Sequence, residues 1–140
     1  MAMWITAGLN HRLRGPSGIR VETLAAAVAA ALAGAALTTW AMRVNRFFSA
    51  VVRIQKDRGH VVVDQGPYAI VRHPGYTGMA LFTMATPLIL DSGWALIPAA
   101  LTVAVMVLRT LLEDRTLQQE LDGYTAYTQR VRARLLPLIW

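Results

Sequence analysis

The stretch GPYAIVRHPGYTG gathers the side chains most able to do chemistry in an otherwise apolar chain. It places Tyr68, Arg72, His73 and Tyr76 around Pro74, directly before an apolar run. Pro74 biases His73 toward extended backbone and suits the first position of the helix that follows. Unpaired N–H groups in the first turn of such a helix form a ready site for a carboxylate or phosphate. A helix entry explains the proline alone, whereas the tyrosines and the histidine favour a binding pocket.

A second pair of ionisable residues, Arg109 and Glu113, follows at the end of another apolar run. Residues four positions apart share one face of a helix. Ionisable groups so close to membrane depth are costly and indicate function, although an ion pair that closes the helix at the surface is the alternative. If the two apolar runs form a hairpin, this pair returns beside His73 and Tyr76. One cavity would then hold a cationic ligand, an anionic substrate and aromatic walls.

Composition points to a membrane. The chain has 140 residues, 55% apolar and 16% charged, against roughly 45–50% and about 25% in soluble domains. We therefore expect one domain, residues 1–140. Cysteine is absent, which excludes disulfides and thiol nucleophiles. His60 and His73 have no third ligand at a suitable spacing, so we predict no metal site.

The elements that must position these residues begin with a first span, predicted over residues 21–43. Its central nineteen residues, 24–42, carry no charge, close to the roughly 20 residues that cross a bilayer. Alanine and Gly34 favour close packing on other helices rather than contact with lipid. A signal peptide is the competing interpretation, which the length of the run disfavours.

A helical hairpin is predicted over residues 75–112, with a turn at residues 91–93. Its first limb is short. Pro87 and Pro98 lie inside the limbs, and we expect them to kink the two helices. The resulting fold class is all-α, an integral membrane helical bundle of about three transmembrane helices, one N-terminal span plus the hairpin, followed by C-terminal interfacial helices.

Charge sets the orientation. A hairpin puts the stretches from Arg43 to Arg72 and from Arg109 to Arg134 on one face, with eleven of the fourteen lysines and arginines, so the positive-inside rule places that face in the cytoplasm. We expect a plasma or bacterial inner membrane. The cations flank apolar runs instead of forming a stripe, which favours lipid headgroups over nucleic acid as a partner.

The polar tail after Glu113 is interrupted at Gly123, and we expect two short interfacial helices there. Further residues are assigned to the surface. We expect a solvated His11, aromatic rings at headgroup depth and a basic cluster facing lipid phosphates; these are Tyr124, Tyr127 and Trp140, and Arg130, Arg132 and Arg134.

Three stretches, HVVVDQGPYAIVRHPGYTG, RTLLED and YTAYTQRVRARLLP, resemble the isoprenylcysteine carboxyl methyltransferase and phospholipid methyltransferase family of integral membrane enzymes. The likeness covers about residues 38–140, and the combination of GPY, RHPxY and a downstream Arg-x-x-x-Glu is specific. The resemblance implies S-adenosylmethionine as cofactor, bound on the cytosolic side within residues 44–74 and the helix starts beside them. It also implies a lipidic or isoprenoid methyl acceptor.

The resemblance assigns roles residue by residue. It implies that Arg109 orients the acceptor and forms a catalytic pair with Glu113, which also binds the cofactor. The other implied cofactor contacts are Gln55, His60, Val61, Val62, Val63, Tyr68, Arg72, His73, Pro74, Gly75 and Tyr76. Two departures stand out: Asp114 replaces the usual second Glu, and few residues precede Leu24, as in an N-terminally trimmed member.

Two functions remain open from the sequence. The first is methyl transfer to a carboxylate of an isoprenylcysteine-like or fatty molecule, or to a lipid amine. A carboxylate is already ionised and needs no base, whereas an amine would lose a proton to His73 or Glu113. The second is a non-enzymatic helical membrane module, or an inactive truncated fragment, that packs with helix partners or further copies of itself.

Overall fold

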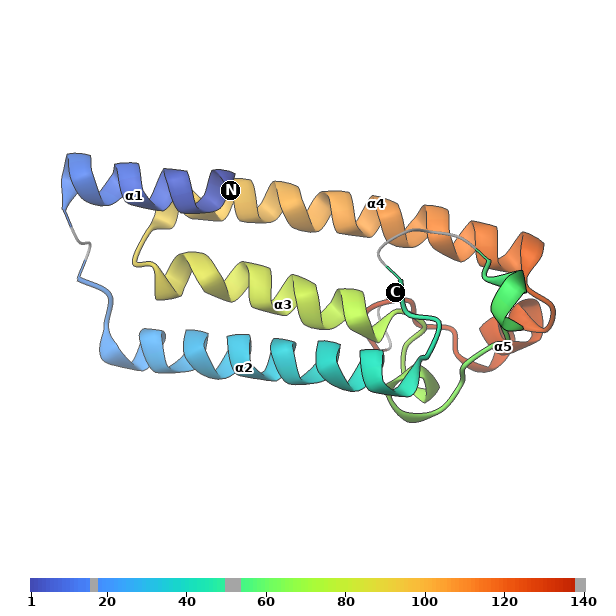
Figure 1. The fold of residues 1–140 in the computed structure, drawn as a ribbon. Helices are drawn as coiled ribbons and strands as arrows, with labels where there is room; N and C mark the ends of the chain where they lie inside the picture. The colour runs from blue at the N-terminus through green and yellow to red at the C-terminus, as the bar shows by residue number, and fades with distance from the viewer. Residues whose placement is uncertain (16–17, 50–53, 138–140) are drawn as a thin grey trace.

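The protein is described by a computed structural model that covers residues 1–15, 18–49 and 54–137. Within these ranges it is all-helical, with no strand (Figure 1). The helices are α1 (Ala2–Arg14), α2 (Val21–Val44), α3 (Pro74–Ile89), α4 (Leu96–Glu120) and α5 (Tyr124–Arg130), with short 3-10 turns η1 (Lys56–Arg58), η2 (Gly66–Ala69) and η3 (Gly93–Ala95).

The closest helix contact joins α2 to α3, which run antiparallel (Figure 1). Small residues make it possible, because a Cβ added to Gly34 would meet the Gly78 carbonyl oxygen at 2.5 Å. A Cβ on Gly78 would meet Thr38 Oγ1 at 2.4 Å. The alanine-rich span therefore packs on another helix through its small face, as predicted.

The hairpin turn lies where the sequence predicted it, between α3 and α4. Asp91 adopts the left-handed conformation, with φ 48°, and η3 leads directly into α4. Both prolines lie near this turn and not at mid-helix. Pro87 falls in the last turn of α3, and Pro98 in the first turn of α4. The kinks expected at these two prolines stay a prediction.

Helix α4 continues without a break across residue 113, where the sequence suggested that the hairpin ends and a separate interfacial helix begins. The helix extends as far as Glu120, because LLEDRTLQQE contains good helix formers and neither Gly nor Pro. A single short helix, α5, follows the interruption at Gly123, whose φ is 82°. Arg109, Glu113 and Asp114 thus lie on one long helix that extends beyond the apolar run.

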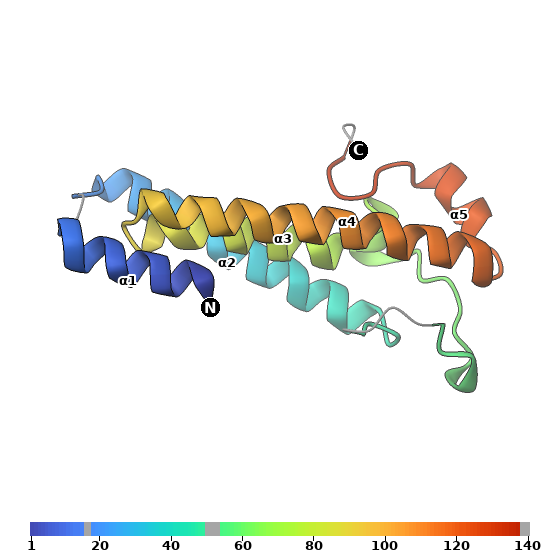
Figure 2. The same cartoon turned by 90° about the horizontal axis from the view of Figure 1, so that it is seen from above.

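An N-terminal helix that the sequence reading did not anticipate, α1, packs beside η3 and the start of α4 (Figures 1 and 2). His11 Nε2 donates to the Leu90 carbonyl oxygen at 2.8 Å, and the Gly18 N–H donates to Asp91 Oδ2 at 3.2 Å. His11 is exposed, as expected of a solvated residue, and its side chain in addition ties α1 to the hairpin turn.

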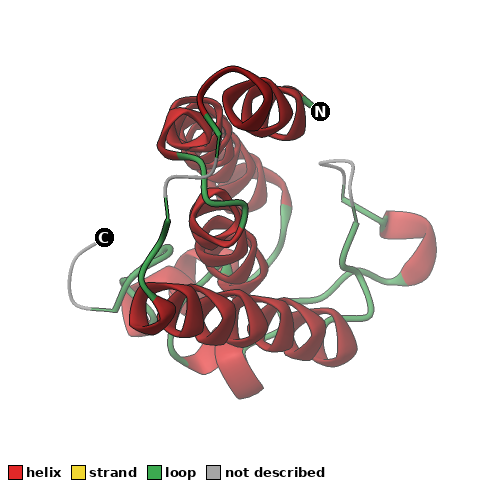
Figure 3. Ribbon diagram, turned by 90° about the vertical axis from the view of Figure 1, so that its left-hand side faces the viewer, coloured by secondary structure: helices red, strands yellow, loops and turns green. Residues whose placement is uncertain are grey.

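Among the residues that the structure describes, two helical segments are long and apolar enough to cross a membrane, Val21–Val44 and Gly93–Glu120. Helix α3 is shorter, 16 residues or about 24 Å, and lies along α2. The view along the long axis shows α2, at the bottom, tilted across the others (Figure 3). One face of α4 exposes a row of large apolar side chains, as a lipid-facing helix does. The row is Ile97, Leu101, Val105, Leu108 and Leu112.

Candidate functional site

A cavity of about 250 Å³ lies at the end of the bundle where α2 ends, α3 begins and the C-terminal half of α4 passes. Segment 54–65 and the segment after α5 lie on opposite sides of α4 there (Figure 2). The predicted meeting of the RHPGY segment with Arg109 and Glu113 is observed. The walls comprise Asn45, Phe47, Phe48, Ser49, Ile54, His60, Val61, Val62, Val63, Tyr68, Arg72, His73, Gly75, Tyr76, Met79, Arg109, Glu113, Thr116, Leu117, Leu121, Tyr124 and Tyr127.

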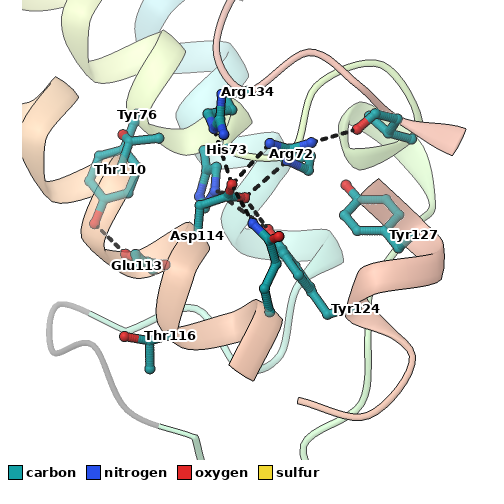
Figure 4. A network of polar contacts seen from close by, with 12 residues as sticks. Arg72, His73, Tyr76, Thr110, Glu113, Asp114, Thr116, Tyr124, Tyr127 and Arg134 are labelled. Carbon is teal, nitrogen blue, oxygen red and sulfur yellow. Dashed lines mark hydrogen bonds and ion pairs between the residues drawn. The ribbon is translucent and has the colours of Figure 1, made fainter. Parts of the chain in front are cut away.

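A polar bridge joins the hairpin helices at this cavity. Tyr76 Oη donates to Glu113 Oε2 at 2.8 Å and accepts from Arg109 Nε at 2.7 Å. The Arg109 guanidinium also lies 6.0 Å from the centre of the Tyr76 ring. One turn of α4 therefore presents a cation and an anion to the cavity. Tyr76, in the first turn of α3, binds both of them, and Figure 4 shows its contact with Glu113.

The next residue of α4, Asp114, points away from that bridge into a buried polar cluster (Figure 4). Arg72 donates to both of its carboxylate oxygens, each at 2.9 Å, through Nε and one terminal nitrogen. His73 Nε2 lies 3.3 Å from Oδ1. Three further side chains donate to the same carboxylate at 2.9–3.0 Å: Tyr124, Gln118 and Arg134. We call these residues with Asp114 the Asp114 cluster.

Two tyrosines hold α5 against the site. Tyr124 Oη donates to Asp114, and Tyr127 Oη donates to the Tyr68 carbonyl oxygen at 2.7 Å. Burial raises the pKa of both phenols, and the Asp114 carboxylate raises it further, so both remain protonated donors. Both side chains are buried against Leu121, so they pack inside the protein and do not offer their rings to lipid headgroups; their expected headgroup depth stays a prediction. Trp140 lies outside the described residues.

The loop wall of the cavity is built on an aromatic pair. The Phe47 and His60 rings lie 4.4 Å apart, and the backbone N–H of Gln55 donates to His60 Nδ1 at 3.3 Å. Gln55 itself is buried, and its amide binds the Phe47 carbonyl oxygen at 2.7 Å and accepts from Arg58 at 2.7 Å. Gln55 therefore shapes the loop behind the wall. Burial lowers the pKa of His60, which favours the neutral ring.

Tyr68 lies between α2 and the cavity. Its hydroxyl donates to the Ala41 carbonyl oxygen at 3.4 Å and accepts from Asn45 Nδ2 at 3.3 Å. Burial raises the pKa of the Tyr68 phenol, so the ring is a neutral wall. Its ring is thus fixed by the end of α2.

Most residues that the resemblance assigned to the cofactor line this one cavity. Gln55 and Pro74 do not, and both act on the backbone behind it. Arg72 lines the cavity, but its nitrogens bind Asp114 and the carbonyl oxygens of Val131 and Arg132. Its contacts are those of a clamp within the protein.

Several contributors were missed by sequence reasoning. Asp114 was noted only as a departure, and Arg134 was assigned to a lipid-facing cluster, yet both lie in the Asp114 cluster. Arg130 pairs with Asp64 at the surface. The available signal was the adjacency of Asp114 to Glu113, because consecutive residues on a helix point to different faces.

The donor set fits a sulfonium nucleoside such as S-adenosylmethionine. A carboxylate and aromatic faces can hold its positive charge, and the aliphatic wall of Val61, Val62 and Val63 suits its nucleoside. The start of α3 supplies a helix N-terminus for its carboxylate, although the Thr77 N–H already binds the His73 carbonyl oxygen. A Cβ on Gly75 would meet the Phe48 ring at 2.6 Å, so this glycine makes room for an aromatic wall.

Comparison with known proteins gives a consistent result. The sequence profile of the isoprenylcysteine carboxyl methyltransferase (ICMT) family matches residues 26–120. Protein-S-isoprenylcysteine O-methyltransferase B of Arabidopsis thaliana is 30% identical over 89 residues, 62% of this chain and 45% of that protein. The Saccharomyces cerevisiae protein-S-isoprenylcysteine O-methyltransferase is 34% identical over 73 residues, 52% of this chain and 28% of that protein.

Among solved structures, the eukaryotic intramembrane Ras methyltransferase ICMT superposes with a TM-score of 0.82 at 22% identity. The match covers 99% of this chain and 50% of that one. At this identity the likeness concerns the fold, and it confirms the predicted all-helical membrane bundle. The chain spans about half the length or less of these relatives.

Proposed function

Because the chain belongs to the isoprenylcysteine carboxyl methyltransferase family, as the RHPxY and Arg-x-x-x-Glu motifs predicted, we propose that it transfers a methyl group from S-adenosylmethionine to a membrane-soluble acceptor. The acceptor class that we favour is the carboxylate of an isoprenylcysteine-like or fatty molecule. The observation that carries the proposal is the bridge from Arg109 through Tyr76 to Glu113 on the wall of one cavity. A helix that merely packed would gain nothing from it.

Size and polarity of the cavity support a small-molecule ligand. Its volume of about 250 Å³ lies just below the usual range of ligand pockets, roughly 300–1,000 Å³. Its walls combine aromatic and aliphatic side chains with a few convergent polar groups, which is the usual make-up of such sites. S-adenosylmethionine, when bound, supplies a methyl group on a positively charged sulfur.

Each residue of the bridge then has a task. Glu113 is half-buried and offers negative charge where the sulfonium would lie. Arg109, four residues earlier, carries a planar guanidinium of the kind that binds carboxylates through paired hydrogen bonds. Tyr76 sets the spacing between the two charges. Arg109 would attract the carboxylate of the acceptor and Glu113 the sulfonium of the donor, so both reactants would bind in the same cavity.

The chemistry requires positioning more than proton transfer. The acceptor oxygen forms the new bond to the methyl carbon with its own electron pair, while the carbon–sulfur bond breaks and its pair stays on sulfur. An anion and a cation neutralise each other, so removal of water by the apolar walls favours the transition state. A lipid amine would first have to lose a proton. His73 is a poor base for it, because its Nε2 already faces Asp114.

The membrane is part of the proposal. We infer that the cavity faces the cytoplasm and that the acceptor arrives from the lipid, since the exposed row on α4 ends beside Arg109. The basic residues that follow α2 suit the cytoplasmic face of a plasma membrane or a bacterial inner membrane. In that membrane the chain could pack with further copies of itself or with other helices.

The decisive experiment is calorimetric titration of the detergent-purified protein with S-adenosylmethionine. We expect saturable binding that Glu113→Ala and His73→Ala both weaken at least tenfold, with Thr102→Val as a matched control on the far part of α4. Absence of binding by the folded wild-type protein would instead support a non-enzymatic helical module or an inactive fragment. A radiolabelled methyl assay on total lipid extract, separated into acid and amine products, then identifies the acceptor.

A further inference from the structure

The segment that follows α5, residues 131–135, lies against the chain just before α3, and we call it the C-terminal strap. The backbone N–H groups of Arg72 and His73 donate to the carbonyl oxygens of Ala133 and Arg134, both at 2.9 Å. Thr77 Oγ1 donates to the Leu135 carbonyl oxygen at 2.7 Å. Consecutive residues of the strap thus pair with the RHPGY segment.

Side chains reinforce this pairing. One terminal nitrogen of Arg72 donates to the carbonyl oxygens of Val131 and Arg132, at 3.1 and 3.2 Å. From the strap, Arg134 Nε donates to Asp114 Oδ2 at 3.0 Å. The strap is therefore fixed from two sides, by the loop before α3 and by α4.

The charged groups of this arrangement can be buried because they compensate one another. The Asp114 carboxylate faces two guanidiniums, those of Arg72 and Arg134, and Arg72 and Asp114 are almost fully buried, with side chains 5% and 1% exposed. A buried charge is tolerated only when its partners satisfy it. The strap carbonyls accept both hydrogen bonds of the other terminal nitrogen of Arg72, so undocking the strap would leave a buried cation under-bonded.

No residue of the strap lines the cavity, whereas Arg72 and His73, which it holds, both do. We propose that the C-terminal strap is a positioning element of the ligand site: it docks on the Asp114 cluster and fixes the backbone of Arg72 and His73 in the conformation that binds the methyl donor. This inference rests on the proposed function, because it concerns binding of that donor. The strap acts through the residues that it holds and touches no ligand.

Thermodynamic linkage gives the proposal a measurable consequence. If the binding conformation requires a docked strap, a bound ligand must stabilise docking by the same factor by which docking improves affinity. A segment that only covers the fold would dock equally well with and without ligand. Trypsin can distinguish the two cases, since Arg132 and Arg134 lie within the strap.

We would digest the full-length detergent-purified protein with trypsin, with and without saturating S-adenosylhomocysteine. We expect the ligand to slow cleavage after Arg132 and Arg134 by about 5-fold or more. Cleavage after Arg12 and Arg14, at the opposite end of the bundle, serves as an internal control and should not change.

A matched pair of variants tests the same coupling from the other side. Thr77→Val removes the hydrogen bond to Leu135, and Thr102→Val removes an equivalent bond to the Pro98 carbonyl oxygen on α4, far from the strap. We expect Thr77→Val to weaken S-adenosylhomocysteine binding about 3- to 10-fold, the effect of one hydrogen bond, and Thr102→Val to leave it unchanged.

The outcomes separate the two proposals. Wild-type protein that binds the ligand while strap cleavage keeps its rate would overturn the role of the strap and leave the proposed function standing. Folded wild-type protein that shows no binding heat would overturn the proposed function and, with it, this role. If Thr77→Val fails to fold, the wild-type digestion alone still decides between coupling and simple cover.

Discussion

Glu113 and Asp114 are neighbours in the chain with the same charge, yet they stand in opposite environments. Glu113 is half-buried on the cavity wall and accepts a hydrogen bond from Tyr76. Asp114 is 1% exposed and accepts from five side chains: Arg72, His73, Gln118, Tyr124 and Arg134. Consecutive positions on one helix thus separate two tasks.

This difference indicates that Glu113 contributes to ligand affinity and Asp114 to the stability of the fold. A carboxylate whose lone pairs are all used by the protein has none to offer a ligand, so Asp114 organises the fold. Glu113 keeps acceptor capacity toward the cavity. Substitution of Asp114 should therefore lower mainly the stability of the protein, and substitution of Glu113 mainly its affinity for the ligand.

The largest effect is expected for Asp114→Ala. It leaves Arg72 buried without its counter-charge, and breaking a buried pair in this way costs about 3–5 kcal/mol. We expect a large drop in the thermal midpoint in detergent, measured as the loss of helical far-ultraviolet circular dichroism on heating. Asp114→Glu is the control that keeps the charge. An Asp114→Ala protein that melts like wild type would show that the cluster does not hold the fold together.

Glu113→Gln should produce the converse result. The substitution keeps the size of the side chain and removes the charge that faces the proposed sulfonium, while the Tyr76 hydroxyl still has an acceptor. We expect S-adenosylmethionine affinity to fall about 10- to 100-fold, the range for a hydrogen bond or contact to a charged group. The thermal midpoint should stay close to wild type. A variant that loses stability and keeps affinity would reverse the assignment of the two acids.

The asymmetry between these acids also shows what the sequence could predict. The helical periodicity and the apolar runs predicted α2, the hairpin turn at Asp91 and the contact of Tyr76 with Glu113, because these features follow from local spacing and from a single hairpin. The docking of Tyr124, Tyr127 and Arg134 onto Asp114 depends on how the tail folds back, which has no periodic signal. The continuity of α4 past residue 113 was missed because a change from apolar to polar residues does not itself end a helix.

A smaller effect is expected for Tyr76→Phe. The ring stays, but both hydrogen bonds of its hydroxyl are lost, so Arg109 and Glu113 are no longer held at a fixed separation. We expect methyl transfer to fall roughly 3- to 10-fold in total, mainly through KM for the acceptor, because both charges remain in place, with little change in the thermal midpoint. Tyr127→Phe, which breaks the bond to the Tyr68 carbonyl oxygen, is the control and should lower stability more than it lowers affinity.

The two cavity histidines extend the comparison and give the smallest effect. His73 faces Asp114, whereas His60 accepts the N–H of Gln55 and has its pKa lowered by burial. The native state therefore binds a proton at His60 less readily than the unfolded state does. The contribution of His60 to the free energy of unfolding is fully present above the usual histidine pKa range and is lost as the pH falls through that range. A protonated ring would also repel a cationic donor. Between about pH 7.5 and 5.5, we expect wild-type affinity for S-adenosylmethionine to weaken slightly and His60→Phe to show less of this change. Equal pH slopes in both proteins would remove His60 from the cavity electrostatics and leave them to the charges on α4, among which Glu113 and Asp114 set the contrast.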